Sequence, residues 1–125
     1  MTATPETIPA RFRRQARSLN DKPLFLVKRA GAYAPVSYRD AWADAQAFGA
    51  FLINQRIAAG DRILILSETR AEWGLADLAI QSAGAWSVPL YPTLTPADIA
   101  TICADCEPAA CVASTPEQAA KLLEI

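Results

Sequence analysis

Apolar residues along this chain follow helical spacing in some segments and form short unbroken runs in others. The pattern therefore predicts strands and helices in alternation. The strand-like runs are 24–28, 33–38, 62–67, 85–90 and 110–113. The helices are expected from Thr7 to about Asn20, after Ser37, from Arg70 to about Ala83, after Thr95 and after Thr115.

The first two runs predict a small β-hairpin that leads into a helix. Leu24–Lys28 is one strand, Tyr33–Tyr38 is the return strand, and the segment 29–34 between them contains Gly31. Pro35 lacks a backbone N–H, which favours a strand start or a sheet edge for the second strand.

Helix starts are marked by hydroxyl residues that can accept a hydrogen bond from a backbone N–H in the first turn. Ser37 with Asp40 resembles a capping box, and Thr69 with Glu72 follows the same spacing. Thr7, Thr95 and Thr115 each stand just before a proline in the first turn of a helix, where the missing N–H of proline costs little.

Two central helices have different faces. After Ser37, small and large apolar residues share one arc of the helical wheel, which suits close packing on a sheet. This arc consists of Ala41, Trp42, Ala45, Phe48, Gly49, Leu52 and Ile53, with Asp40, Asp44, Asn54 and Gln55 opposite. The helix over 70–83 is apolar almost all round, which predicts protein on more than one of its sides.

The unbroken run Ile63–Leu66 predicts a strand that is buried on both faces, as in a parallel sheet. From Arg62 onward the elements alternate strand and helix, which favours right-handed crossovers. The expected fold class is α/β, with an N-terminal hairpin and helices followed by a βαβαβα parallel-sheet unit.

The domain expectation is a single N-terminal subdomain over 1–125, with a flexible terminus at 1–6. The chain stops inside its last expected helix, at Leu122-Leu123-Glu124-Ile125, as if a larger domain had been cut. Together with the apolar helix over 70–83, this predicts exposed hydrophobic surface and a homo-oligomer that covers it.

Composition narrows the function classes. The chain has 125 residues, 12 Lys and Arg, 13 Asp and Glu, and no His. The missing His excludes Ser-His-Asp and Cys-His catalysis and His-containing zinc sites within this chain. A hydrophobic content of 52% argues against disorder, and a net charge of −1 argues against a nucleic-acid partner.

The sequence also bears on the cellular compartment and on membrane insertion. The first 15 residues contain no apolar run of a secretory signal. The uncharged stretch 78–97 contains Pro89, Pro92 and Pro96, which would break a spanning helix, so we expect no transmembrane segment but a buried strand between two helices. Three clustered cysteines fit reduced thiols in a cytosolic protein better than a secreted disulfide framework.

No recognised nucleotide motif is present. The sequence contains neither G-x-G-x-x-G nor G-x-x-x-x-G-K-[ST], and Glu68 and Glu72 would oppose a phosphate at the start of the helix over 70–83. Cys103, Cys106 and Cys111 are interpreted as small buried residues, with a redox or metal site as the less favoured alternative.

Tryptophans and arginines also have structural interpretations. Trp42, Trp73 and Trp86 are expected in the core because each lies in an apolar stripe or strand. Arg11, Arg13, Arg14 and Arg17 form the one basic cluster, interpreted as a solvated helix face, with an anion or membrane-surface contact as the alternative.

Several local patterns together resemble the AMP-forming adenylating enzymes. Val36–Ala41 resembles their first core motif, with Val36, Asp40 and Ala41 where the family has Leu, Glu and Leu. Gly60–Leu66 is similar to the family segment G-D-R-V-A-I-L, and Ser82–Tyr91 resembles the second core motif. Ser67–Trp73 and Tyr91–Pro96 look most like the bacterial long-chain fatty acyl-CoA synthetase branch.

The resemblance implies the N-terminal subdomain of an enzyme several times longer. Such enzymes join a carboxylate to ATP as an acyl-adenylate, with Mg²⁺, and transfer the acyl group to coenzyme A. The phosphate loop, adenine-binding segments, magnesium-binding acid and catalytic lysine of the family all follow the matched region. We therefore assign no catalytic, cofactor-binding or metal-binding residue, and expect this chain alone to be inactive.

The partners implied by the resemblance are the remainder of the synthetase domain, fatty acid, ATP and CoA. The implied location is the cytoplasm, peripheral to the inner membrane surface. Two alternatives stay open at this point: a stand-alone, non-catalytic α/β interaction module, and an adenylating enzyme for an amino or aryl acid.

Overall fold

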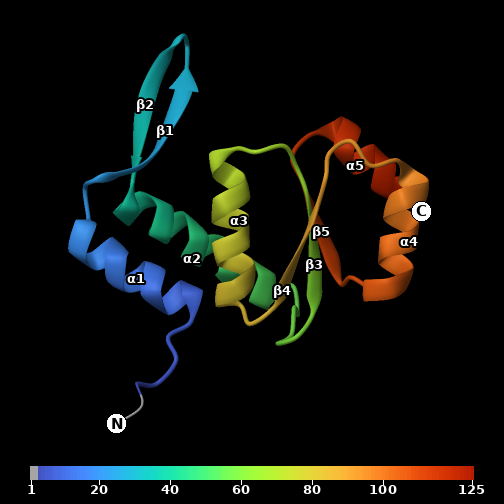
Figure 1. The fold of residues 1–125 in the computed structure, drawn as a ribbon, viewed down its shortest axis with the longest axis horizontal. Coiled ribbons are helices and arrows are strands. Elements are labelled where there is room, and N and C mark those ends of the chain that lie inside the picture. The colour runs from blue at the N-terminus through green and yellow to red at the C-terminus, as the bar shows by residue number, and fades with distance from the viewer. Residues whose placement is uncertain (1–2) are drawn as a thin grey trace.

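A three-stranded parallel sheet lies between two layers of helices, and a hairpin projects from one end (Figure 1). The structure is a computed structural model that describes residues 3–125. Its elements are α1 (Ile8–Leu19), β1 (Pro23–Arg29), β2 (Ala32–Ser37), α2 (Tyr38–Asn54), β3 (Arg62–Leu66), α3 (Ala71–Ser82), β4 (Trp86–Leu90), α4 (Pro96–Cys106), β5 (Ala110–Ala113) and α5 (Pro116–Leu123).

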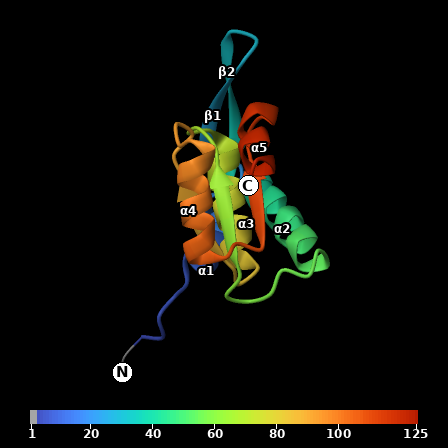
Figure 2. The ribbon, with the colours of Figure 1, turned by 90° about the vertical axis from the view of Figure 1, so that its right-hand side faces the viewer.

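The order of the sheet is β4-β3-β5, and both pairings are parallel, as the alternating pattern predicted. The chain moves from β3 to β4 through α3 and then returns past β3 to β5 through α4. Right-handed crossovers in opposite directions place their helices on opposite faces. Figure 2 shows α4 and α5 on the face that is turned away from α3.

The central strand β3 divides the hydrophobic core into two clusters. Ile63 and Ile65 face α2 and α3, whereas Leu64 and Leu66 face α4 and α5. All four side chains are at most 1% exposed, so the expected double-sided burial is confirmed. The fold class is therefore α/β, with the predicted βαβαβα unit after the hairpin.

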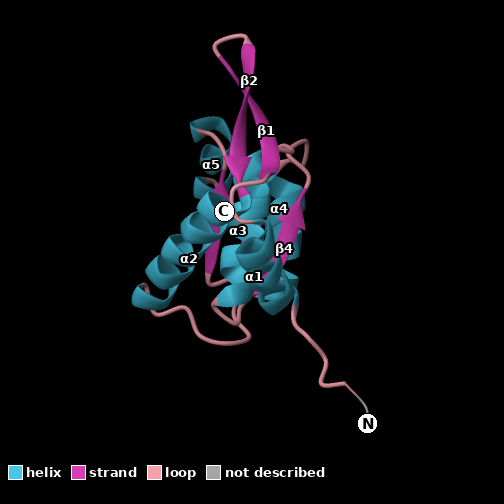
Figure 3. Cartoon of the chain, turned by 90° about the vertical axis from the view of Figure 1, so that its left-hand side faces the viewer, coloured by secondary structure: helices cyan, strands magenta, loops and turns pink. Residues whose placement is uncertain are grey.

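Helix α3 packs against β3 and β4 on one side and against α2 on another, and α1 contacts both helices (Figure 3). Its buried residues are Ala76, Leu78, Ala79 and Ile80. A Cβ on Gly49 of α2 would lie 3.3 Å from the carbonyl oxygen of Ala79, so glycine permits this close approach. As predicted, α3 has protein on several of its sides, and all of it comes from this chain. The expectation that α3 leaves a large apolar surface uncovered is therefore wrong.

The stripe on α2 is also narrower than its sequence suggests. Ala41, Ala45, Gly49 and Leu52 are buried, whereas Ile53 is 57% exposed. Leu52 faces the core, and the next residue is turned by about 100° around the helix, which directs Ile53 outward.

Aromatic contacts join α1 to α2. The ring of Phe12 lies 5.8 Å from that of Tyr38 and 5.9 Å from that of Trp42, measured between centroids. These separations are typical of favourable aromatic pairs, so they fix the position of the first helix on the second.

The hairpin forms as predicted, with a tighter turn. Arg29 pairs with Ala32, leaving Ala30 and Gly31 as a two-residue loop in which both residues have positive φ. That is the geometry of a type I′ turn, which matches the twist of the flanking strands. The return strand ends at Ser37, and Tyr38 begins the helix rather than ending the strand.

Four of the five expected helix caps are confirmed. The hydroxyls of Thr7, Ser37, Thr95 and Thr115 each accept a hydrogen bond from the backbone N–H three residues later. Thr69 does not cap α3: the N-cap is Arg70, which makes no side-chain cap bond. The guanidinium of Arg70 instead pairs with the Glu72 carboxylate, at 2.8 Å, so Glu72 is engaged by an ion pair.

Strand β4 lies at an edge of the sheet, and this corrects two expectations. Trp86 is 66% exposed rather than buried in the core, and of the residues of β4 only Leu90 is buried. An edge strand has no neighbour on its outer side, and Pro89 on such an edge lacks the donor that would recruit one. Trp73 is half-buried and packs against the core, as expected, whereas Trp42 is half-buried but lies in neither core cluster.

The ends of the chain differ in part from expectation. Helix α5 ends at Leu123, before the last residue, and Leu123 is 88% exposed. Residues 3–6 have no regular structure, and Glu6 pairs with Arg14 at 2.9 Å. The predicted flexibility of 1–6 stays a prediction, and its first two residues lie outside the described part. No helix within residues 3–125 is long and apolar enough to cross a membrane.

Replacing Ile65 by alanine tests the double-sided core. Because Ile65 is fully buried in the middle strand, we expect Ile65→Ala to lower the free energy of unfolding by about 2–5 kcal/mol in urea titrations. Ile53→Ala is the matched control, and its exposed site should change stability by less than about 0.5 kcal/mol. Equal losses in both variants would contradict this division of the core.

The α4 capping box predicts a pH-dependent contribution to stability. Hydrogen bonds from the Thr95 hydroxyl and backbone N–H lower the pKa of Asp98. A carboxyl with a depressed pKa stabilises the fold above its unfolded pKa of about 3.9, and the stabilisation is lost as pH falls through the folded pKa.

We therefore expect Asp98→Asn to lower the urea midpoint at pH 7 and to leave it close to that of the unmodified chain near pH 2. Asp105→Asn, in the same helix outside the cap, is the control. A difference between the unmodified chain and Asp98→Asn that persists undiminished at low pH would rule out the charged cap.

Candidate functional site

The carboxyl ends of the three parallel strands meet at one edge of the sheet. Ser67 follows β3, Tyr91 follows β4 and Ser114 follows β5. The chain leaves β3 in one direction for β4 and returns on the other side for β5, so the strand order reverses between β3 and β5. In open α/β sheets, ligands bind in the crevice outside such a reversal.

A hydrogen bond spans this reversal. The hydroxyl of Ser114 donates to Oε2 of Glu68 at 2.7 Å, although the two residues are 46 positions apart. This bond is the main reason that the pKa of Glu68 is lowered. Ser67 donates its own hydroxyl to the carbonyl of Glu68 at 2.7 Å, which orients the backbone at the same place.

Arg70 connects two carboxylates beside the start of α3. Its Nε lies 2.8 Å from Glu72 and its Nη1 lies 3.4 Å from Glu68. The guanidinium lowers the pKa of Glu72 and contributes to the lowered pKa of Glu68. These groups are solvent-exposed, so the pairs add little stability, and the three charges sum to −1.

Two hollows lie on either side of Trp73 at this edge. One has a volume of about 220 Å³ and is lined by Ile65, Ser67, Arg70, Glu72, Trp73, Ala76 and 112–114. The other has a volume of about 440 Å³ and is lined by 67–69, Trp73 and 89–92. Together they form the strand-end cleft. Its lining combines the indole ring of Trp73 and two prolines with a polar rim that includes Glu68, Arg70 and Glu72. The ring and the prolines suit contact with an apolar or aromatic group.

Helix α5 holds the loop that borders the larger hollow. The ammonium of Lys121 donates to the carbonyls of Pro92 at 2.6 Å and Leu94 at 2.9 Å, and Gln118 donates to Pro92 at 3.2 Å. The loop after β4, which carries the exposed Tyr91, is therefore fastened from the opposite side of the sheet. We call this set of bonds the α5 clasp.

The strand-end cleft does not supply a triphosphate or magnesium site by itself. Its carboxylates Glu68 and Glu72 stand beside the N-terminus of α3, where a polyphosphate would need donors and positive charge. Residues 3–125 contain no cluster of three or more His, Cys, Asp or Glu side chains that could hold a metal.

The cysteines lie away from the cleft, beneath α4 and α5. Cys103, Cys106 and Cys111 are unpaired and pack against the cluster of Leu64 and Leu66. Burial raises the pKa of the Cys111 thiol to about 11, and burial likewise raises that of Cys103. This arrangement supports the interpretation that the cysteines are protonated thiols that pack as small apolar side chains.

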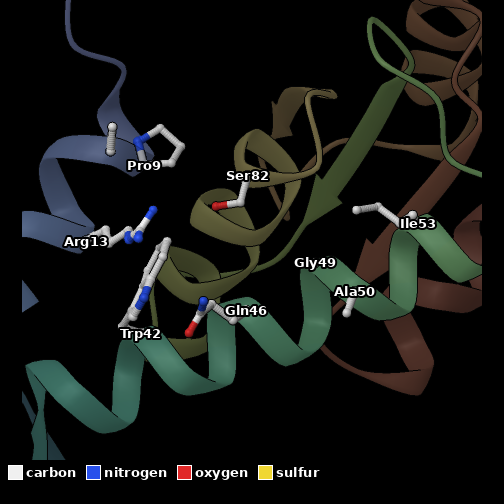
Figure 4. A pocket seen from close by; sticks show the side chains of 9 residues that line it. Pro9, Arg13, Trp42, Gln46, Gly49, Ala50, Ile53 and Ser82 are labelled. Atoms are coloured by element: carbon white, nitrogen blue, oxygen red, sulfur yellow. The ribbon is translucent and has the colours of Figure 1, made fainter.

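A third hollow lies among α1, α2 and α3, far from the strand ends. Figure 4 shows Arg13 extending from α1 toward the ring of Trp42, with Ser82 of α3 on the opposite wall. The four arginines of the basic cluster are exposed, in agreement with a solvated helix face.

The sequence analysis named Glu68 and Glu72 of the strand-end cleft but none of the polar residues that reach it from the end of the chain. Ser114, Gln118 and Lys121 come from the last quarter of the chain and contact residues 26 to 46 positions earlier. The signal that could have located Ser67 and Ser114 is their position directly after a parallel strand, because those ends share one edge.

Comparison with known proteins agrees with this architecture. A family model described as AMP-binding enzyme matches residues 12–125. A long-chain-fatty-acid–CoA ligase, FadD15 of Mycobacterium bovis, is 33% identical over 95 residues, which cover 76% of this chain and 16% of the relative. The chain thus spans about a sixth of the length of that relative.

Solved structures of adenylate-forming enzymes resemble the fold of this chain. A provisionally assigned long-chain-fatty-acid CoA ligase from Rhodopseudomonas palustris superposes with a TM-score of 0.80 at 28% identity, covering 94% of this chain and 30% of that one. The N-terminal subdomain of Klebsiella oxytoca NpsA, solved with 3-hydroxybenzoyl-AMSN, gives 0.80 at 19% identity over 89% of this chain and 27% of that one. From the family match over 12–125, this chain belongs to the AMP-binding enzymes.

Proposed function

We propose that this chain forms the N-terminal part of an ATP-dependent, AMP-forming fatty acyl-CoA synthetase. The complete enzyme would join a carboxylate to ATP, release pyrophosphate, and then pass the acyl group from AMP to the thiol of CoA. The observation that carries the proposal is the 33% identity to a long-chain-fatty-acid–CoA ligase over 76% of this chain.

The strand-end cleft supports a division of labour within that enzyme. Trp73 and the prolines of its lining fit a wall against an acyl or aromatic group, whereas the carboxylates of Glu68 and Glu72 would repel a triphosphate. Transfer of an adenylyl group needs preorganised donors and Mg²⁺ around the phosphates. We assign those groups, and ATP, Mg²⁺ and CoA binding, to the remainder of the synthetase domain.

The acid assigned to the complete enzyme is a long-chain fatty acid. The fatty-acid choice follows the named relatives from Mycobacterium and Dictyostelium discoideum, of which the latter is called fatty acyl-CoA synthetase A. The structural neighbour NpsA was solved with an aryl ligand and shares the fold at 19% identity. Aryl and amino acids therefore serve as the competing substrates in the test.

Pyrophosphate exchange tests the division of labour. We expect the purified 125-residue chain to catalyse no ATP–pyrophosphate exchange with a long-chain fatty acid. A polypeptide that continues through the rest of the family domain should catalyse the exchange. Isotope incorporation into ATP is the measurement, and the longer polypeptide with aryl and amino acids is the specificity control.

Each outcome decides a different point. Exchange by the 125-residue chain would overturn its role as a non-catalytic wall. Faster exchange with aryl or amino acids would overturn the fatty-acid assignment. No exchange by the longer polypeptide with any acid would favour a stand-alone interaction module.

Exposed apolar residues on the β4 side predict self-association of the isolated chain. Trp86 is 66% and Tyr91 78% exposed. We expect the mass measured by light scattering to rise with concentration, and Trp86→Lys to reduce that rise by removing apolar contact area. Lys28→Ala, at an exposed position on the distant hairpin, is the control, and a concentration-independent monomer would contradict the prediction.

A further inference from the structure

The hollow among α1, α2 and α3 has the form of a groove with one charged end. Its volume is about 420 Å³, within the range of small-molecule sites. The lining residues are Pro9, Ala10, Arg13, Trp42, Gln46, Gly49, Ala50, Ile53 and Ser82. Figure 4 shows Arg13, Trp42 and Gln46 gathered at one end and Ile53 at the other.

The apolar side of the groove follows α2. Trp42 and Ile53 are eleven positions apart, which corresponds to roughly 16 Å of helix. Between these two ends, Gly49 has no side chain and Ala50 has only a methyl group. No large side chain therefore fills the floor of the groove there. Ile53 is 57% exposed and offers an accessible apolar surface at the far end of the groove.

The charged end depends on Arg13. Within residues 3–125 this guanidinium makes no ion pair, whereas its neighbour Arg14 is held by Glu6 at 2.9 Å. The hydroxyl of Ser82 donates to the carbonyl of Leu78, and within the described residues no hydrogen bond joins it to Arg13. No carboxylate lines the groove. The charge of Arg13 is therefore available to an anion from outside the chain.

We propose that this groove binds the anion of a long-chain carboxylic acid, with the carboxylate at Arg13 and the acyl chain along α2 toward Ile53. A guanidinium matches a carboxylate in charge and in its planar pair of hydrogen bonds. An acyl chain is narrow enough for a floor formed by Gly49 and Ala50. The groove lies away from the strand-end cleft, so this binding site is separate from the proposed adenylation.

The dimensions favour a single chain over a larger partner. A volume of about 420 Å³ is that of a small-molecule site, whereas a stable protein partner needs an interface of about 800 Å² on each side. A membrane surface would engage the exposed arginines of α1 together, with no special role for Arg13. Binding of a fatty acid should therefore depend on Arg13 in particular, whereas binding of a membrane surface should depend on all the exposed arginines of α1.

Isothermal titration of the 125-residue chain with palmitate, below its micelle concentration, tests the site. We expect saturable binding that weakens by about tenfold or more in Arg13→Glu, because a charged hydrogen bond is lost and repulsion replaces it. Ala50→Glu, which fills the floor of the groove, should weaken binding to a similar extent. Arg11→Glu is the matched control: it makes the same charge change on the same helix outside the groove and should leave the affinity unchanged.

Two comparisons separate other occupants. Hexadecanol has the same chain without the charge and should bind more weakly than palmitate. Vesicles rich in phosphatidylglycerol should respond equally to Arg11→Glu and Arg13→Glu. Equal losses of palmitate binding in these two variants, equal affinity for hexadecanol, or binding to vesicles but not to palmitate would each overturn the proposal.

Fluorescence gives a readout that does not depend on variants of the groove. In a chain carrying Trp73→Phe and Trp86→Phe, Trp42 is the remaining tryptophan. Palmitate carrying bromine atoms near its carboxyl end should quench Trp42 more than palmitate brominated near its methyl end. The reverse order would contradict the proposed direction of the chain. Failure of palmitate binding leaves the pyrophosphate-exchange result untouched, so the two proposals stand or fall separately.

Discussion

The middle strand imposes the constraint on which the rest of the structure depends. Ile63–Leu66 is apolar at every position, so it is stable only with helices on both faces and strands on both edges. Supplying both edges from one continuous chain forces two crossovers in opposite directions. The reversal of strand order, and with it the strand-end cleft, is therefore a geometric result of burying one tetrapeptide.

Local signals in the sequence were reliable where short-range physics decides the outcome. The caps at Ser37 and Thr95 and the run Ile63–Leu66 depend on neighbours within a few residues, and all three appear as expected. Thr69 and Trp86 failed for another reason. At the start of α3, Arg70 pairs with Glu68 and Glu72, each two positions away, in place of a cap by Thr69. The exposure of Trp86 follows from the position of β4 at the edge of the sheet, which no local pattern shows.

The strand-end cleft was harder to foresee because tertiary contacts assemble it. Glu68 and Ser114 meet only after β3 and β5 pair, 46 positions apart along the chain. The positions after parallel strands are predictable once the strands are known, but the partner of each side chain is not. Membership of the family could be inferred earlier, because the matching segments of that family are continuous stretches of sequence.

The α5 clasp has a consequence for how this fold can be divided. Helix α5 contains no fully buried residue, and its contact with the core cluster of Leu64 and Leu66 is made by the partly buried Leu122. Yet Lys121 and Gln118 together satisfy the carbonyls of Pro92 and Leu94, which belong to the opposite edge of the sheet. A shorter polypeptide that ended after β5 would leave those oxygens without their donors and release the turn that carries Tyr91. The smallest cooperative unit of this architecture therefore includes α5, although that helix has no fully buried residue.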